Sequence, residues 1–278
     1  MEFKTAANLN EALLLRRQFP RFQILAGGTD LCVQLNSGLL KSEGLINIFG
    51  IKELSEIIES ENHVEIGAIA THTQIIQNDL AQKFLMPLVE ACRSIGARQI
   101  QNRGTIGGNV MNASPAGDTL PVLLALDAEI ELASSDKKRR IPFSQFYTGY
   151  RKSIVAQDEI LSKLIIPKLS AESKSGFFKI GTRKAQAISK VMAAFRIDFD
   201  SELIKDARIA YGSVAPIPVR IKEVENYLRG RKLNKATITK SLELLKGAIK
   251  PIDDIRSTSA YRNHLCQVIL GRFLRSLI

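Results

Sequence analysis

Two glycine-rich segments contain the residues best suited to bind a ligand. The first is Ala26-Gly27-Gly28-Thr29-Asp30-Leu31, and the second runs from Arg103 to Asn109 with glycines at positions 104, 107 and 108. Glycine lets a backbone turn tightly or approach a ligand closely, and the amides it leaves uncovered can point at an anion. Both segments are therefore predicted to be cofactor loops.

The two familiar phosphate-binding motifs do not fit the second segment. A dinucleotide fingerprint that starts at Gly107 needs glycines where Asn109 and Asn112 stand, and the chain has no Gly-Lys-Ser/Thr phosphate loop. In the first segment, Thr29 and Asp30 add a hydroxyl and a carboxylate to the exposed amides. We therefore expect backbone amides of both segments, rather than a lysine, to hold a pyrophosphate.

Short strands and helices are expected to position these segments. Residues 22–25 predict a strand that enters the first glycine segment, and an apolar stretch at 120–126 predicts a buried helix after the second. Ser114 or Asp118 is the expected N-cap of that helix, with Pro121 in its first turn. A helix N-terminus should thus open just past the glycines.

The rest of the first 168 residues predicts a mixture of helices and strands. The expected helices cover 9–19, with Asn8 or Asn10 as cap, a segment that begins at Thr71, and 87–95; the expected strands cover 44–48, 57–58, 63–68, 128–132, 139–142 and 159–167. Lys137–Arg140 is expected to be a solvated hairpin tip, and Tyr147 and Tyr150 to be half-buried with hydrogen-bonded hydroxyls.

A polar linker at 168–175 is predicted to precede a second domain. Strands are expected at 177–180, 187–199 and 207–211, followed by helices at 219–228, 234–249 and 259–277. In the last helix, one face is expected to pack on the core through Leu265, Val268, Ile269, Phe273 and Leu274.

Composition is that of a soluble globular protein, with 45% hydrophobic and 24% charged residues in a chain long enough for two domains. Three scattered cysteines and three histidines predict neither a disulfide framework nor a metal site. The N-terminus lacks a signal-peptide pattern, and no apolar run reaches the ~20 residues of a membrane span. A cytoplasmic location is therefore expected.

The net charge of +11 is unevenly distributed. Residues 1–133 contain 10 basic and 15 acidic side chains, whereas residues 134–278 contain 29 and 13. Aromatic residues are not interleaved with the basic ones and no nucleic-acid motif is present, so nucleic acid is not expected as a partner. The basic half is better suited to a protein partner or an anionic nucleotide.

In combination, these motifs resemble the FAD-binding (medium) subunit of the molybdenum hydroxylase family, of the xanthine dehydrogenase and carbon monoxide dehydrogenase type. The resemblance covers most of the chain. Its motifs are 26–31, Ile66-Gly67-Ala68, 105–109 with Ser114, Pro115 and Asp118, Phe178-Lys179 with Arg183, 212–220, and Asp254-Ile255-Arg256 with Tyr261-Arg262.

This resemblance implies an α+β fold. A two-part FAD-binding domain of the vanillyl-alcohol-oxidase-like type would span 1–168, with subdomains at about 1–55 and 56–168, and a smaller C-terminal domain with an antiparallel sheet and helices would span 176–278. The residues expected to contact FAD are Ile24, Leu25, Ala26, Gly27, Gly28, Thr29, Asp30, Leu31, Ile95, Thr105, Ile106, Gly107, Gly108, Asn109, Ser114, Asp118, Leu161 and Lys179.

The implied function is electron transfer. A 2Fe-2S small subunit would pass electrons to this FAD, which would pass them to NAD or another acceptor, while molybdopterin would lie on a large subunit. No side chain of this chain would then be catalytic, because the flavin does the chemistry. Many relatives have an acidic residue near Gln186, so its absence here puts NAD in question. The alternatives are a stand-alone flavin oxidase or reductase and a non-enzymatic basic binding module.

Overall fold

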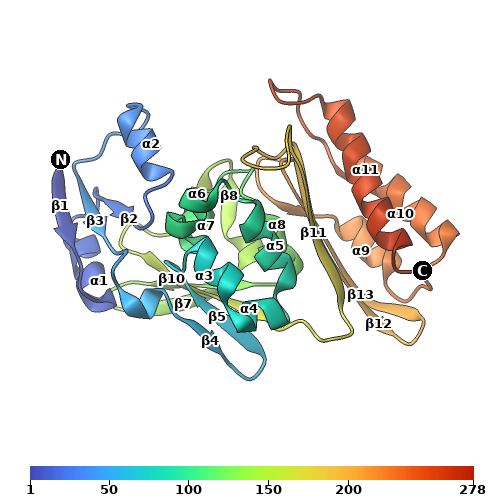
Figure 1. Ribbon diagram of the computed structural model, residues 1–278, viewed down its shortest axis with the longest axis horizontal. Coiled ribbons are helices and arrows are strands. Elements are labelled where there is room, and N and C mark those ends of the chain that lie inside the picture. Colours follow the sequence, from blue (N-terminus) through green and yellow to red (C-terminus); the bar gives the residue numbers. More distant parts are fainter.

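The computed structural model describes residues 1–278 (Figure 1). Its N-terminal part is a three-stranded parallel sheet in the order β1-β3-β2, flanked by helices. The elements are β1 (Glu2–Thr5), α1 (Leu9–Gln18), β2 (Gln23–Leu25), α2 (Leu31–Asn36), β3 (Gly44–Asn47) and the 3-10 turn η1 (Lys52–Leu54). Helix α1 begins where the Asn8 side chain accepts a hydrogen bond from the Glu11 amide at 3.0 Å, so Asn8 is the cap.

The middle part is built on a five-stranded antiparallel sheet in the order β4-β5-β10-β6-β7. Its strands are β4 (Ile57–Glu59), β5 (His63–Gly67), β6 (Glu129–Ala133), β7 (Lys138–Pro142) and β10 (Ile160–Pro167), and β8 (Tyr147–Gly149) and β9 (Lys152–Ser153) form a separate hairpin. The helices are α3 (His72–Gln77), α4 (Asp79–Phe84), α5 (Met86–Ser94), α6 (Arg98–Arg103), α7 (Ile106–Met111), α8 (Leu120–Ala125) and the 3-10 turn η2 (Phe143–Gln145).

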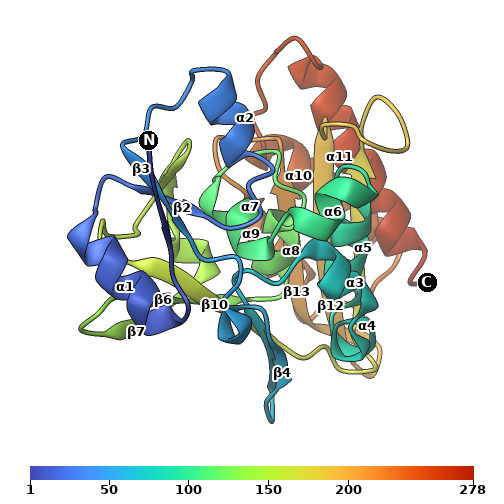
Figure 2. The same ribbon diagram turned by 60° about the vertical axis from the view of Figure 1, so that its left-hand side comes forward.

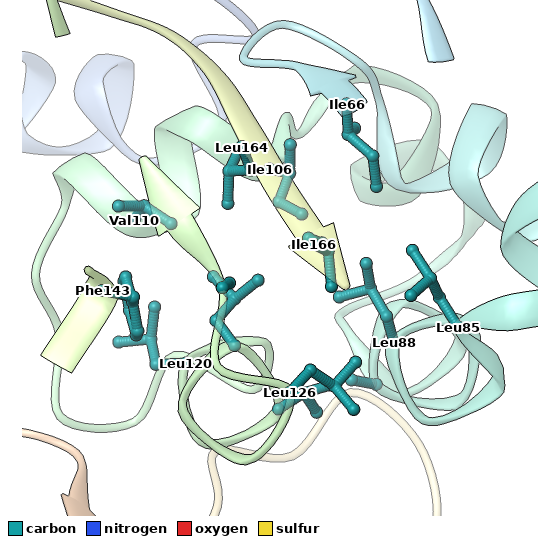
Figure 3. Packing of buried hydrophobic residues seen from close by; sticks show 14 of the residues in the cluster. Ile66, Leu85, Leu88, Ile106, Val110, Leu120, Leu126, Phe143, Leu164 and Ile166 are labelled. Atoms are coloured by element: carbon teal, nitrogen blue, oxygen red, sulfur yellow. The ribbon is translucent and has the colours of Figure 1, made fainter. Parts of the chain in front are cut away.

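The core of the middle part lies between this sheet and the helices (Figure 3). Leu164 and Ile166 of β10 are fully buried, as are Ile66 of β5 and Leu88 of α5. Full burial of one such side chain contributes about 1.5–3 kcal/mol. Strand β10 is the central strand, which explains its nearly unbroken apolar sequence up to Pro167.

The C-terminal part is a four-stranded antiparallel sheet, β11-β12-β13-β14, covered on its outer face by helices (Figure 1). The strands are β11 (Lys174–Ile180), β12 (Val191–Asp200), β13 (Leu203–Gly212) and β14 (Val219–Arg220), and the helices are α9 (Lys222–Leu228), α10 (Lys235–Ala248) and α11 (Ser259–Arg275). Ala194 and Ala210 belong to the same buried cluster as the residues of α8, so the inner face of this sheet packs on the middle part.

An ionic network joins the same two parts. Asp127, which follows α8, accepts hydrogen bonds from Arg208 at 2.6 Å and from Arg220 at 2.5 Å. Arg220 also forms a two-bond pair with Glu225, whose side chain is only 1% exposed. Because Arg220 and Glu225 are largely buried, each needs its partner to offset the cost of desolvation.

The α+β fold with an antiparallel C-terminal sheet is confirmed, and three local predictions were wrong in part. The strand predicted at 139–142 is present as part of β7, but the solvated hairpin tip predicted at Lys137–Arg140 is wrong for Arg139, whose side chain forms an ion pair with the buried Glu159 at 2.6 Å. In α11, Ile269, Phe273 and Leu274 are buried as predicted, whereas Val268 is 36% exposed and Cys266 and Leu270 are buried in addition. The hydroxyl of Tyr147 donates to the Val110 carbonyl at 2.8 Å as predicted, whereas Tyr150 is 59% exposed rather than half-buried.

Candidate cofactor site

A cavity of about 560 Å³ lies where the N-terminal and middle parts meet. Its volume is within the range of ~300–1,000 Å³ that is typical of small-molecule sites. Both glycine segments line it, together with residues of α1, β10 and the hairpin β8–β9. Segments far apart in the sequence therefore share one site.

The first glycine segment offers five consecutive unused hydrogen-bond donors. The backbone N–H groups of residues 27–31 donate no hydrogen bond within the chain, and all five residues line the cavity. Gly28 has a φ of +76°, a conformation that side chains rarely adopt. Consecutive free amides of this kind form an anion-binding concavity, and β2 fixes the start of the segment.

The two glycine segments touch each other. A Cβ on Gly27 would overlap the carbonyl of Arg103, and a Cβ on Gly107 would lie 2.5 Å from the carbonyl oxygen of Ala68. A backbone carbonyl cannot move aside as the end of a side chain can. At these two positions glycine is therefore required by backbone packing rather than by a ligand.

The second glycine segment is not the loop that was predicted. Residues from Ile106 onward form the short helix α7, because the Thr105 side chain caps it by accepting from the Gly108 amide at 3.1 Å. The amides of Ile106 and Gly107 donate to the carbonyls of Ala70 and Ala68 at 3.0 and 2.8 Å. These amides already donate hydrogen bonds within the chain, so the donors that remain free for a ligand belong to the first glycine segment. A Cβ on Gly108 would meet only Thr105 Oγ1, at 2.8 Å.

Most of the residues predicted to contact FAD line the cavity. They are Ile24, Ala26, Gly27, Gly28, Thr29, Asp30, Leu31, Ile95, Thr105, Gly107, Gly108, Asn109 and Leu161. The others lie off its wall: Ile106 is fully buried in the core, Leu25 is half-buried, and the Ser114 hydroxyl accepts from the Ala116 amide at 3.3 Å. Asp118 and Lys179 are described next.

Asp118 and Lys179 form a buried ion pair beside the cavity. Lys179 of β11 donates to Asp118 at 2.5 Å and to the Ser94 carbonyl at 2.9 Å, and the Ser189 hydroxyl donates to the other carboxylate oxygen at 2.6 Å. Burial raises the pKa of Asp118, against the opposing effect of Lys179 and the hydrogen bonds. Neither Asp118 nor Ser114 caps α8 as predicted, because its N-cap is Thr119.

Several cavity residues were not identified from the sequence. Arg16, Gln34, His72, Asn112 and Arg151 all line the cavity but lie outside the glycine motifs. Burial lowers the pKa of His72 to about 4, so its imidazole is neutral, and its Nδ1 has no hydrogen-bond partner. These positions are brought together by tertiary contacts alone, and no local pattern in the sequence indicates them.

Two features are absent from the structure. No three His, Cys, Asp or Glu side chains gather in a way that could hold a metal ion. No helix has the length and the apolar character needed to cross a bilayer.

Comparison with known proteins assigns two regions of the chain to protein families. The family described as "FAD binding domain in molybdopterin dehydrogenase" matches residues 1–169, and the family described as "CO dehydrogenase flavoprotein C-terminal domain" matches residues 176–277. The chain is 31% identical to the nicotinate dehydrogenase FAD-subunit of Eubacterium barkeri, over 100% of this chain and 96% of that protein. It is 30% identical to the putative xanthine dehydrogenase FAD-binding subunit of Escherichia coli (strain K12), over 99% and 95%.

The likeness extends to solved structures. Carbon monoxide dehydrogenase from Hydrogenophaga pseudoflava contains a chain with a TM-score of 0.95 and 25% identity, and the match covers 99% of this chain and 96% of that one. These relatives are subunits of dehydrogenases, which excludes the alternative of a non-enzymatic binding module. The chain therefore belongs to the FAD-binding subunits of the molybdenum hydroxylase family, the oxidoreductases that include xanthine and carbon monoxide dehydrogenases.

Proposed function

We propose that this chain holds FAD in the cavity and carries electrons from a 2Fe-2S small subunit to an acceptor. A molybdopterin-binding large subunit would complete the complex, which we place in the cytoplasm. The names of two relatives, an FAD-subunit and a medium chain, support an assembly of several subunits. When bound, FAD supplies the electron-accepting and electron-releasing chemistry.

The row of free amides carries this proposal. The N–H groups from Gly27 to Leu31 have no acceptor in the chain, and these residues line a cavity large enough for a cofactor. A pyrophosphate would accept hydrogen bonds from these amides without requiring a lysine. Thr29 and Asp30, on the same segment, offer a hydroxyl and a carboxylate to the sugar hydroxyls.

The remaining cavity residues would orient the cofactor. Ile95 and Leu161 give an apolar wall, and the amide group of Asn109 is fixed because its oxygen accepts from Thr119 at 2.6 Å. The charge of Lys179 lies next to the cavity in its pair with Asp118. None of these residues needs to act as an acid, a base or a nucleophile.

The segment between β11 and β12 bears on the choice of electron acceptor. The segment after β11 contains Arg183, Lys184 and Gln186 and no acidic residue. Acidic groups in this segment can influence a nicotinamide site, so NAD and oxygen are both tested as acceptors.

Anaerobic mixing tests electron transfer directly. The FAD-loaded chain is mixed with its pre-reduced 2Fe-2S subunit, and the visible flavin absorption is followed in a stopped-flow instrument. We expect the absorption to be lost on mixing and to return when the acceptor is added, with NADH formation as the readout for NAD. A flavin that stays oxidised contradicts the proposal. Turnover of a small organic substrate by the isolated chain would instead identify a stand-alone flavoenzyme.

A further inference from the structure

Arg16, near the end of α1, lines the cofactor cavity without a counter-charge. Its Nη1 group donates to the carbonyl of Phe22 at 2.7 Å, which is the only hydrogen bond of this side chain, and it forms no ion pair. Burial lowers the pKa of the guanidinium, and the charge of Asp158 opposes that effect from a distance. A partly desolvated cation normally has an anionic partner, so this one needs an explanation.

The Arg16 guanidinium keeps hydrogen-bond donors for a ligand. Its Nε is enclosed by protein and has no partner. Its Nη2 also has no partner in the chain, but it is not among the enclosed atoms. Nη2 is therefore the group from which a molecule in the cavity can accept a hydrogen bond. Because arginine has donors and no acceptor, the matching atom of the ligand must be an acceptor.

Arg16 and Ile95 lie at opposite ends of the cavity. Ile95 directly follows α5, and α1 and α5 lie on opposite sides of α7 in both views of the molecule (Figures 1 and 2). Two further cavity residues, Ile100 and Met111, are 38% and 43% exposed, and Ile100 precedes Gln101, which donates to the Ile95 carbonyl at 3.1 Å. The end of the cavity at Ile95 is therefore open to the surface.

The end of the cavity at Arg16 is enclosed. Leu13, one turn before Arg16 on α1, packs in the same buried cluster as Ile48 and Ile160, and both of these isoleucines line the cavity. Their side chains are only 3% and 4% exposed. Two buried isoleucines offer an apolar surface to a flat ring, and the guanidinium beside them supplies a directed polar group. This combination is typical of a small-molecule subsite.

The two ends of the cavity suit the two halves of FAD. The flavin ring exchanges electrons with other proteins and needs the open end, whereas the adenosine takes no part in that chemistry and can be enclosed. The strand β2 leads from Phe22, the partner of Arg16, to the free amides of residues 27–31, which would hold the pyrophosphate. The ring nitrogens of adenine are acceptors, which match a side chain that only donates.

We propose that Arg16 binds the adenosine half of FAD by donating from Nη2 to a ring nitrogen of adenine, and that this contact makes the cavity prefer FAD to FMN. The proposal rests on the FAD-binding function proposed above. FMN has the flavin ring and one phosphate but no adenosine, so it cannot use this contact. A contact with a non-reacting part of a ligand adds affinity without constraining the reacting ring.

Isothermal titration calorimetry of the cofactor-free chain with FAD, FMN and ADP tests this proposal. Arg16→Met keeps a long side chain that favours helix and removes every donor. Arg17→Met is the matched control, because Arg17 is the next residue of α1, is 62% exposed and pairs with the exposed Asp136 at 3.1 Å. Arg17 does not line the cavity.

We expect Arg16→Met to weaken FAD and ADP binding about 10- to 100-fold, which is the effect of losing a hydrogen bond from a charged donor. FMN binding by this variant should stay within about twofold of wild type, as should binding of all three ligands by Arg17→Met. Retained FMN binding also shows that the cavity is folded. Unchanged FAD and ADP affinities, or an equal loss of FMN affinity, overturn the proposal. A wild-type chain that binds none of the three ligands contradicts the proposed function itself.

Arg16→Lys distinguishes adenine from phosphate as the acceptor. Lysine keeps the charge but lacks the planar array of donors, so ADP affinity should remain at least about fivefold below that of wild type. Full recovery of ADP affinity in Arg16→Lys would show that charge alone is sufficient. That result would assign the guanidinium to the diphosphate and overturn its assignment to adenine.

Discussion

Replacing Lys179 by Met should destabilise the chain strongly. The Lys179 and Asp118 side chains are 14% and 7% exposed and lie 2.5 Å apart, so removal of the lysine leaves a buried carboxylate with no cationic partner and only serine hydroxyls as hydrogen-bond donors. Breaking a buried pair in this way costs about 3–5 kcal/mol. At ~2–4 °C per kcal/mol for chains of about this size, the Tm should fall by roughly 6–20 °C.

The pH dependence of this loss has a definite sign. The pKa of Asp118 is already raised by burial, and removal of Lys179 raises it further. A carboxyl whose pKa is higher in the folded chain favours folding below its unfolded pKa, and that stability is lost as the pH rises through the folded pKa. Lys179→Met should therefore be most damaging at neutral pH and least damaging in acid.

Thermal unfolding followed by circular dichroism measures both effects. Adding Asp118→Asn to Lys179→Met removes the unpaired charge and should recover most of the lost Tm at neutral pH. Lys232→Met breaks an exposed pair with Glu202 of similar length, 2.7 Å, and should leave the Tm unchanged. A Lys179→Met variant that unfolds like the wild type at neutral pH would refute the reasoning.

Three further substitutions test other parts of the account. Gly108→Val places a branched side chain on the cavity wall and should abolish FAD retention while the far-ultraviolet spectrum stays native; Gly247→Val, in open space on α10, should retain FAD. Gly27→Ala forces a methyl group into a facing backbone carbonyl and should cost about 1–3 kcal/mol in a urea titration. Arg220→Met leaves the buried Glu225 with the Ile209 amide and a solvent-exposed lysine as its partners and should cost about 3 kcal/mol by the same titration.

Local sequence signals predicted most elements because their causes are local. Asn8 and Thr71 cap helices where predicted, and the alternation of 63–67 produced a strand. Thr105 shows where prediction from local signals failed. Its side chain caps the helix α7, whereas the glycines that follow it had suggested a loop. The hydrogen bond from the Gly108 amide to the Thr105 hydroxyl stabilises the first turn of α7 in spite of its glycines.

The site was predicted where its residues belong to contiguous motifs and missed where they do not. The segment 26–31 was identified from its glycines, whereas His72 and Arg151 reach the cavity only through packing of distant elements. The contact of Gly27 with the Arg103 carbonyl likewise depends on two segments separated by some 75 residues. The sequence does not show how close two such segments lie in the fold. A glycine required by backbone packing therefore cannot be distinguished, from the sequence alone, from a glycine that contacts a ligand.

The FAD content of the purified chain tests the central claim most directly. The chain is purified without added cofactor, its absorption spectrum is recorded, and the released cofactor is identified after denaturation. We predict FAD at close to one per chain, held by the free amides of residues 27–31. A colourless chain that also fails to bind added FAD would contradict the account.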